Sequence, residues 1–136
     1  MTLQRSIMSK RKAYKPRLIR IPMTKQLYDE FGLQMHSAFA ELCRQPCEEH
    51  FCALGTIMNV VSIAIDKDAK FKDDLLFIRS GVNMMSQIAN KCVAGLPLKD
   101  YEIECIKIAL NRIDDILPYM DVTKLHMANL TLKGLR

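Results

Sequence analysis

The residues that could do chemistry together in a small space are three cysteines and one histidine. Cys43, Cys47, His50 and Cys52 lie within ten residues, and thiolate with imidazole is the ligand set of a tetrahedral zinc site. However, Pro46 separates Cys43 from Cys47, and residues two apart on a helix, such as His50 and Cys52, do not share a face. We therefore predict no metal site and no cofactor, with cysteine serving as a small apolar side chain.

Thiol catalysis would need a cysteine whose pKa is lowered by a histidine or a helix N-terminus, and Cys47 with His50 one turn later is the only such pair. The neighbouring carboxylates of Glu48 and Glu49 oppose thiolate formation. The sequence also lacks a phosphate-binding loop, a dinucleotide fingerprint and the common hydrolase motifs. We predict that the protein is not an enzyme.

Two acidic pairs, Asp73–Asp74 and Asp114–Asp115, and two separate histidines, His36 and His126, also lie in helical patterns. Adjacent residues on a helix diverge by about 100° and cannot form one carboxylate site. We interpret the acids as solvated or helix-start charges, and the histidines as packed or surface side chains.

Basic residues are concentrated at the start of the chain. Residues 1–20 contain seven basic and no acidic side chain, whereas the other 116 residues contain 13 basic and 15 acidic ones. Such an arm suits an anionic partner, because lysine and arginine neutralise phosphates and tyrosine stacks on bases. We predict that the nucleic-acid-binding residues are Lys10, Arg11, Lys12, Tyr14, Lys15, Arg17 and Arg20. A solubilising tail without a partner is the alternative.

Residues 1–16 lack apolar periodicity and are expected to form a flexible arm, with residues 17–136 as a single helical domain. A chain of 136 residues, of which 49% are apolar, is suited to one such domain. Five cysteines without a secretory signal favour a reducing, cytoplasmic location. The longest apolar run, residues 51–65, is too short and too closely flanked by charges to span a membrane.

Apolar spacing predicts an all-α fold, a compact five-helix bundle around a central apolar helix at about 46–66. The expected helices are about 25–44, 46–66, 71–94, 103–117 and 122–133. Thr24 and Asp121 are expected N-caps, Pro46 the first position of the second helix, and Gly95 a C-terminal stop. Gly32 is expected to mark a close helix crossing. Residues 17–22 form an extended lead-in or an edge strand without an evident mate.

Lys15-Pro16-Arg17, then Pro22-Met23-Thr24 and a helix containing Asp29-Glu30-Phe31 and His36, resembles a loosely defined group of uncharacterised small proteins from proteobacterial phages and plasmids. Some members of this group are labelled DNA-binding regulators. The resemblance covers about residues 15–42 and implies a DNA-associated role, but it assigns no functional residue.

These observations predict an accessory or regulatory protein of a mobile element that binds nucleic acid or a nucleoprotein complex through its arm. The alternative is a protein interaction module that inhibits or adapts a host protein, such as a defence complex, without touching nucleic acid. Its surface would use the adaptable side chains of Met84, Met85, Met120 and Met127. In either case the protein could form a homodimer.

Overall fold

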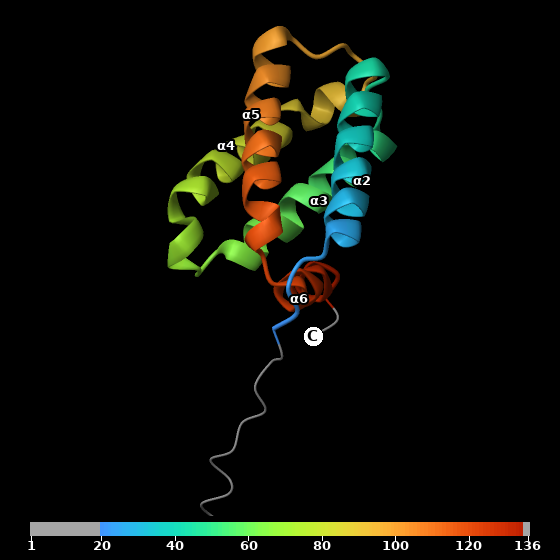
Figure 1. The fold of residues 1–136 in the computed structure, drawn as a ribbon. Helices are drawn as coiled ribbons and strands as arrows, with labels where there is room; N and C mark the ends of the chain where they lie inside the picture. Colours follow the sequence, from blue (N-terminus) through green and yellow to red (C-terminus); the bar gives the residue numbers. More distant parts are fainter. Residues whose placement is uncertain (1–19, 135–136) are drawn as a thin grey trace, which may run out of the picture.

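The described part of the chain, residues 20–134 of a computed structural model, consists of helices joined by short connections. Its five α-helices are α2 (Lys25–Arg44), α3 (Glu48–Ile65), α4 (Lys72–Val93), α5 (Asp100–Ile116) and α6 (Val122–Leu132) (Figure 1). Two 3₁₀ turns, η1 (Ala69–Phe71) and η2 (Leu117–Tyr119), precede α4 and α6. The prediction of an all-α fold is confirmed.

Helix starts follow the local chemistry of their capping residues. The Thr24 hydroxyl accepts a hydrogen bond from the Leu27 N–H at 3.1 Å, and Asp121 accepts one from the Thr123 N–H at 3.0 Å, so both predicted caps are confirmed. The start predicted for the second helix is wrong. Helix α3 begins at Glu48, after an extended Cys47 whose Sγ accepts the His50 N–H at 3.5 Å. Pro46 thus lies before the cap.

The end of α4 confirms the stop expected at Gly95. This glycine has φ +73°, which a residue without Cβ adopts without strain. Its N–H donates to the Cys92 carbonyl and that of Leu96 to the Lys91 carbonyl, both at 3.0 Å. The two bonds form a Schellman motif and satisfy carbonyls that the helix end leaves unpaired.

A glycine also marks a close helix contact, but it is not the glycine that the sequence suggests. Gly81 of α4 is buried against α5, and a Cβ built there would lie 2.4 Å from Ala109 Cβ and 2.9 Å from Met58 Cε. A Cβ at Gly32 would meet nothing within 4 Å. The prediction of a close crossing at Gly32 is therefore wrong, and the crossing lies at Gly81.

Helix α3 packs against α2, α4 and α6. Its buried side chains Leu54, Met58, Val61 and Ile65 share one face, and Val60 is buried on another side of the helix. Its other face is partly open, with Cys52, Ala53 and Thr56 exposed. The most extensive helix pairing joins α4 and α5. A single central helix therefore stays a prediction.

The extended lead-in before α2 does have a mate, the start of α6. Pro22 and Asp121 form an isolated antiparallel bridge. The Ile21 N–H donates to Asp121 Oδ1 at 3.0 Å, and the Val122 N–H donates to the Ile21 carbonyl at 2.8 Å. The chain entering the bundle is thereby tied to α6. The predicted arm of residues 1–16 lies outside the described residues.

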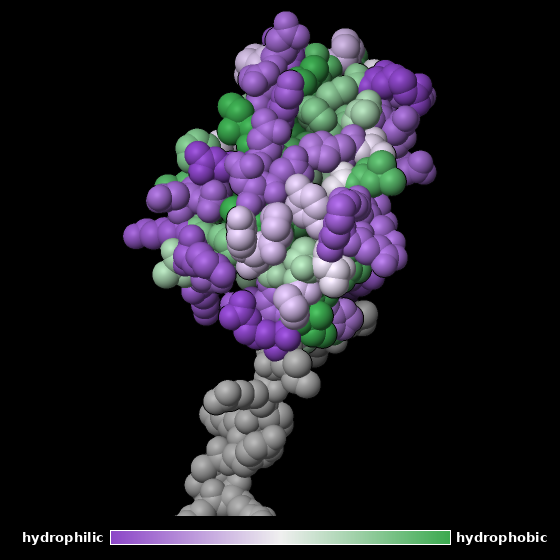
Figure 2. All heavy atoms as spheres, viewed as in Figure 1, coloured by the Kyte–Doolittle hydropathy of each residue, from purple (hydrophilic) through white to green (hydrophobic). Residues whose placement is uncertain are grey.

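Hydrophilic side chains cover much of the surface that Figure 2 shows, and apolar groups appear between them as separate patches. Isolated exposed apolar residues are ordinary on protein surfaces. In the described part of the chain, none of the helices combines the length and the hydropathy that crossing a bilayer requires.

Candidate functional site

Most of the predicted nucleic-acid-binding residues, namely Lys10, Arg11, Lys12, Tyr14, Lys15 and Arg17, lie outside the described residues. Arg20 is the exception. It is exposed, lies in the lead-in, and lines a hollow of about 390 Å³ together with Lys70 and Lys124. The structure therefore brings one predicted cation together with two cations that the sequence analysis did not single out.

Asp121 fixes the lead-in next to this hollow. Its Oδ1 accepts hydrogen bonds from the backbone N–H groups of Ile21 and Thr123, each at 3.0 Å. Partial burial raises the pKa of Asp121, but these donors, with a smaller contribution from the positive charge of Arg20, outweigh burial and lower it. The carboxylate therefore stays ionised at neutral pH and serves as the anchor between the lead-in and α6.

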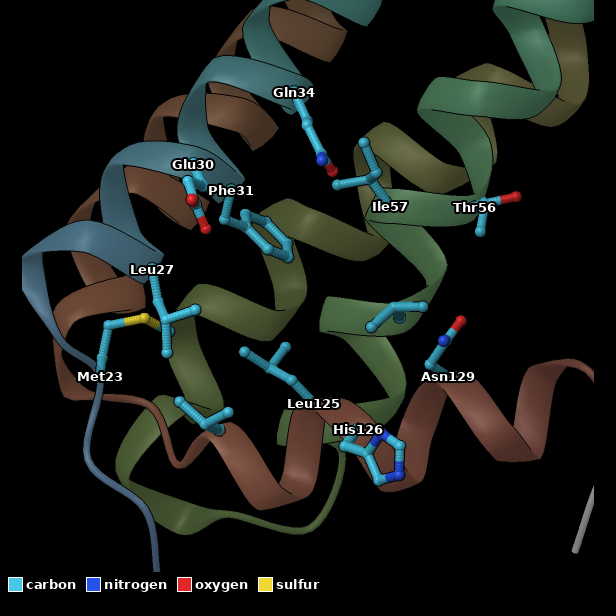
Figure 3. A pocket seen from close by; sticks show the side chains of 12 residues that line it. Met23, Leu27, Glu30, Phe31, Gln34, Thr56, Ile57, Leu125, His126 and Asn129 are labelled. Carbon is cyan, nitrogen blue, oxygen red and sulfur yellow. The ribbon is translucent and has the colours of Figure 1, made fainter.

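A second depression, which we call the apolar groove, lies between the lead-in, α2, α3 and α6. It has a volume of about 450 Å³. In Figure 3, Met23, Leu27 and Phe31 on one side face Leu125 and Ile57 on the other. The polar groups at its margin are Glu30, Gln34, His126 and Asn129. Sequence patterns could not reveal this groove, because it forms only where α6 packs against the distant α2 and α3.

Within the cluster of cysteines and His50, Cys47 is the N-cap of α3. His50 Nδ1 lies 2.9 Å from the Gln45 carbonyl, which can only accept, so this nitrogen carries the proton. The Sγ of Cys47 accepts a hydrogen bond from the backbone N–H of His50 and not from the imidazole ring of His50. Burial raises the pKa of Cys43, which disfavours the reactive thiolate. Among residues 20–134, no group of three or more His, Cys, Asp or Glu side chains is placed to hold a metal ion.

The acidic pairs separate as helix geometry requires. Asp73 and Asp74 lie in the first turn of α4, and Asp74 also pairs with Arg112 of α5 at 3.1 Å. Asp114 is partly exposed, and its Oδ2 lies 2.8 Å from His36 Nε2, so this surface carboxylate also joins α5 to α2.

The methionines proposed for an interaction surface are not all available for contact. Met85 and Met120 are buried in the core, each 3% exposed. Met84 and Met127 are only partly buried. The prediction of an interface built from all four is therefore wrong, since the apolar stripes of α4 and of the η2 connection direct Met85 and Met120 inward.

A buried ion pair joins α4 to the start of α5. Glu102, only 6% exposed, accepts from Lys91 Nζ at 2.8 Å and 3.0 Å and from the Lys99 N–H at 2.7 Å. Lys91, and then the Lys99 N–H, lower the pKa of Glu102 against the opposing effect of burial. The signal was present in the sequence, because Glu102 is the third residue of α5, where a carboxylate caps the helix.

We expect Glu102→Gln to lower the free energy of unfolding at pH 7 by about 2 kcal/mol. A carboxyl group whose pKa is lower in the folded protein than in the unfolded chain stabilises the fold at pH values above its unfolded-state pKa. This stabilisation disappears as the pH falls through the folded-state pKa. Urea unfolding of both proteins from pH 7 to pH 3 should show their difference shrinking toward zero. A difference that stays constant over this range would contradict the role assigned to the ionised pair.

Comparisons of the chain with protein-family models, with curated protein sequences and with solved structures find no match.

Proposed function

We propose that this protein is a non-enzymatic accessory or regulatory protein of a mobile element, acting in the cytoplasm, that binds nucleic acid or a nucleoprotein complex through its basic arm. The observation that carries the proposal is the separation of charge: seven basic and no acidic side chains in residues 1–20, against a small acidic excess in the rest. The assignment to a mobile element rests on the resemblance of residues 15–42 to phage and plasmid proteins.

The pairing of charges within the bundle supports this division. Six basic side chains of the helices have a carboxylate oxygen within 4 Å, and these are Lys25, Arg44, Arg79, Lys91, Arg112 and Lys124. Neutralised cations attract phosphate less than the cations of a segment that has no acidic residue of its own. Homodimerisation of the bundle would present two arms to one nucleic acid and raise the effective affinity.

The direct test is binding of labelled single-stranded and double-stranded oligonucleotides across a salt series, for the full chain and for a chain lacking residues 1–19. The anchor of the lead-in, Ile21 with Asp121, is retained in the shortened chain. We expect tight, salt-sensitive binding only with the arm present. Binding that is equal for both chains would refute the proposal.

A second candidate function, a module that binds a host protein, is favoured by the apolar groove. Helices that dock in grooves bury an apolar face against side chains such as Leu27, Phe31 and Leu125. Its volume of about 450 Å³ lies within the range of small binding sites. In this case the partner would be an amphipathic helix of a host protein, and nucleic acid would not be needed for binding.

Leu27→Glu tests the second candidate. Leu27 lines the groove and is 38% exposed, whereas Leu33 on the same helix lies outside the groove and is 70% exposed. A carboxylate at position 27 would be desolvated by a docked apolar face. In pull-downs from a nuclease-treated bacterial lysate, we expect Leu27→Glu to lose any specific protein partner and the control Leu33→Glu to retain it. Equal retention by both variants would exclude the groove as the binding surface.

A further inference from the structure

Three cations from distant parts of the chain meet at the end of the bundle where the arm enters. Arg20 lies in the lead-in, Lys70 lies in η1, and Lys124 lies in the first turn of α6. All three line the hollow of about 390 Å³, at whose edge Tyr119 is 68% exposed. In Figure 1 the lead-in passes α6 beside the point where the end of α5 connects to it. The hollow therefore includes Arg20, the first residue that the structure describes.

The carboxylates that share the hollow, Asp68 and Asp121, do not neutralise it. Asp121 uses its Oδ1 on the N–H groups of Ile21 and Thr123. Asp68 accepts the Lys70 N–H at 3.1 Å through Oδ1, and its Oδ2 lies 3.7 Å from Lys124 Nζ. Three cations and two carboxylates leave the lining with one net positive charge.

The ammonium group of Lys70 is the one best placed to take an external anion. It donates to the backbone carbonyl of Tyr119 at 3.5 Å and lies 4.9 Å from the centre of the Phe71 ring. Within residues 20–134 it has no carboxylate at ion-pair distance. These contacts hold the Lys70 side chain in position without neutralising its charge. They leave N–H donors of the ammonium group for an external anion.

We propose that this hollow binds one backbone phosphate of the nucleic acid that the arm engages. Lys70 and Arg20 would contact the phosphate directly, Lys124 would add positive potential from beside Asp68, and Tyr119 would stack on the adjacent base. A phosphodiester carries one negative charge, which matches the net charge of the lining. The inference rests on the proposed function and adds to it a fixed point on the bundle that sets the path of the strand.

The test measures binding of fluorescein-labelled oligothymidylate by the full chain, by Lys70→Gln/Lys124→Gln and by the control Lys107→Gln/Lys133→Gln. The control removes the same charge from exposed side chains outside the hollow. Removing two of the three cations around one phosphate should lower the magnitude of the salt slope by up to about 0.7 for a single strand. Tyr119→Ala should weaken binding by at least about fivefold, and its exposed side chain makes loss of folding easy to exclude by circular dichroism.

The outcomes separate the two proposals. A hollow variant that matches the Lys107→Gln/Lys133→Gln control, while removal of residues 1–19 still weakens binding and flattens its salt slope, overturns the phosphate site and leaves the arm's function intact. Failure of the full chain to bind oligothymidylate overturns the phosphate site, and failure to bind duplex DNA as well overturns the proposed function. Binding of inorganic phosphate that depends on Lys70 and Lys124, with oligothymidylate affinity unchanged in the same variant, shows a site for free phosphate and also overturns the inference.

Discussion

Replacing Gly81 with valine is expected to lower the free energy of unfolding by about 3 kcal/mol. A Cβ at this position would lie 2.4 Å from Ala109 Cβ, well inside van der Waals contact, and 2.9 Å from the flexible end of Met58. The flexible side chain of Met58 can move, but the Ala109 Cβ is bonded directly to the backbone of α5 and moves only with that helix. The two helices must therefore separate, which opens the packing along the most extensive helix pair. Urea unfolding followed by circular dichroism measures the change.

Three further variants isolate this cause. Gly81→Ala should also destabilise, although the better helix propensity of alanine offsets part of the overlap. Adding Ala109→Gly to Gly81→Ala should recover stability beyond the sum of the single changes, because it removes the contacting atom. Gly32→Ala, where the new methyl group meets nothing within 4 Å, should stabilise by about 0.5 to 1 kcal/mol. If the two alanine variants changed stability alike, the close approach at Gly81 would be disproved.

Features set by neighbouring residues could be predicted from the sequence. Thr24 and Asp121 cap helices through hydrogen bonds to N–H groups two or three residues later, and Gly95 ends α4 through bonds within one turn. The atoms involved are close along the chain, so residue type and order are sufficient to identify them.

Features set by contacts between helices could not be predicted in this way. Gly32 and Gly81 have the same intrinsic cost in a helix, and only the position of α5 distinguishes them. The pair His36 and Asp114 is separated by 78 positions. Its formation depends on how α2 lies against α5, which the period of either helix does not encode.

The same distinction applies to the candidate site. Composition alone identifies the basic arm, because seven cations without an acid in residues 1–20 need no structural knowledge to recognise. Lys70 and Lys124 look ordinary in the sequence, where each stands in a mixed polar and apolar stretch and not in a basic run. They become candidates only because the bridge between Pro22 and Asp121 brings Arg20 to the same hollow.

Removal of residues 1–19 should have the largest effect on binding, since it deletes six of the seven basic residues at the start of the chain. Each phosphate that is no longer neutralised reduces the salt slope by about 0.9 on duplex DNA and about 0.7 on a single strand. If Lys10, Arg11, Lys12, Lys15 and Arg17 each bind one phosphate, the slope should fall in magnitude by about 4 to 5 on duplex and by about 3 to 4 on a single strand.

A matched control keeps the length of the chain and changes only its charge. Glutamine at positions 10, 11, 12, 15 and 17 should reproduce the effect of the deletion, because the proposed interactions with phosphate are electrostatic. The unfolding midpoints of the three proteins should agree, since the anchor of Ile21 on Asp121 is retained in each.

The salt dependence of oligonucleotide binding, compared between the full chain and the chain without residues 1–19, tests the proposed role of the arm most directly. We predict a steep slope for the full chain and a nearly flat one for the shortened chain. Equal slopes for the two chains, or no binding by either, would contradict it.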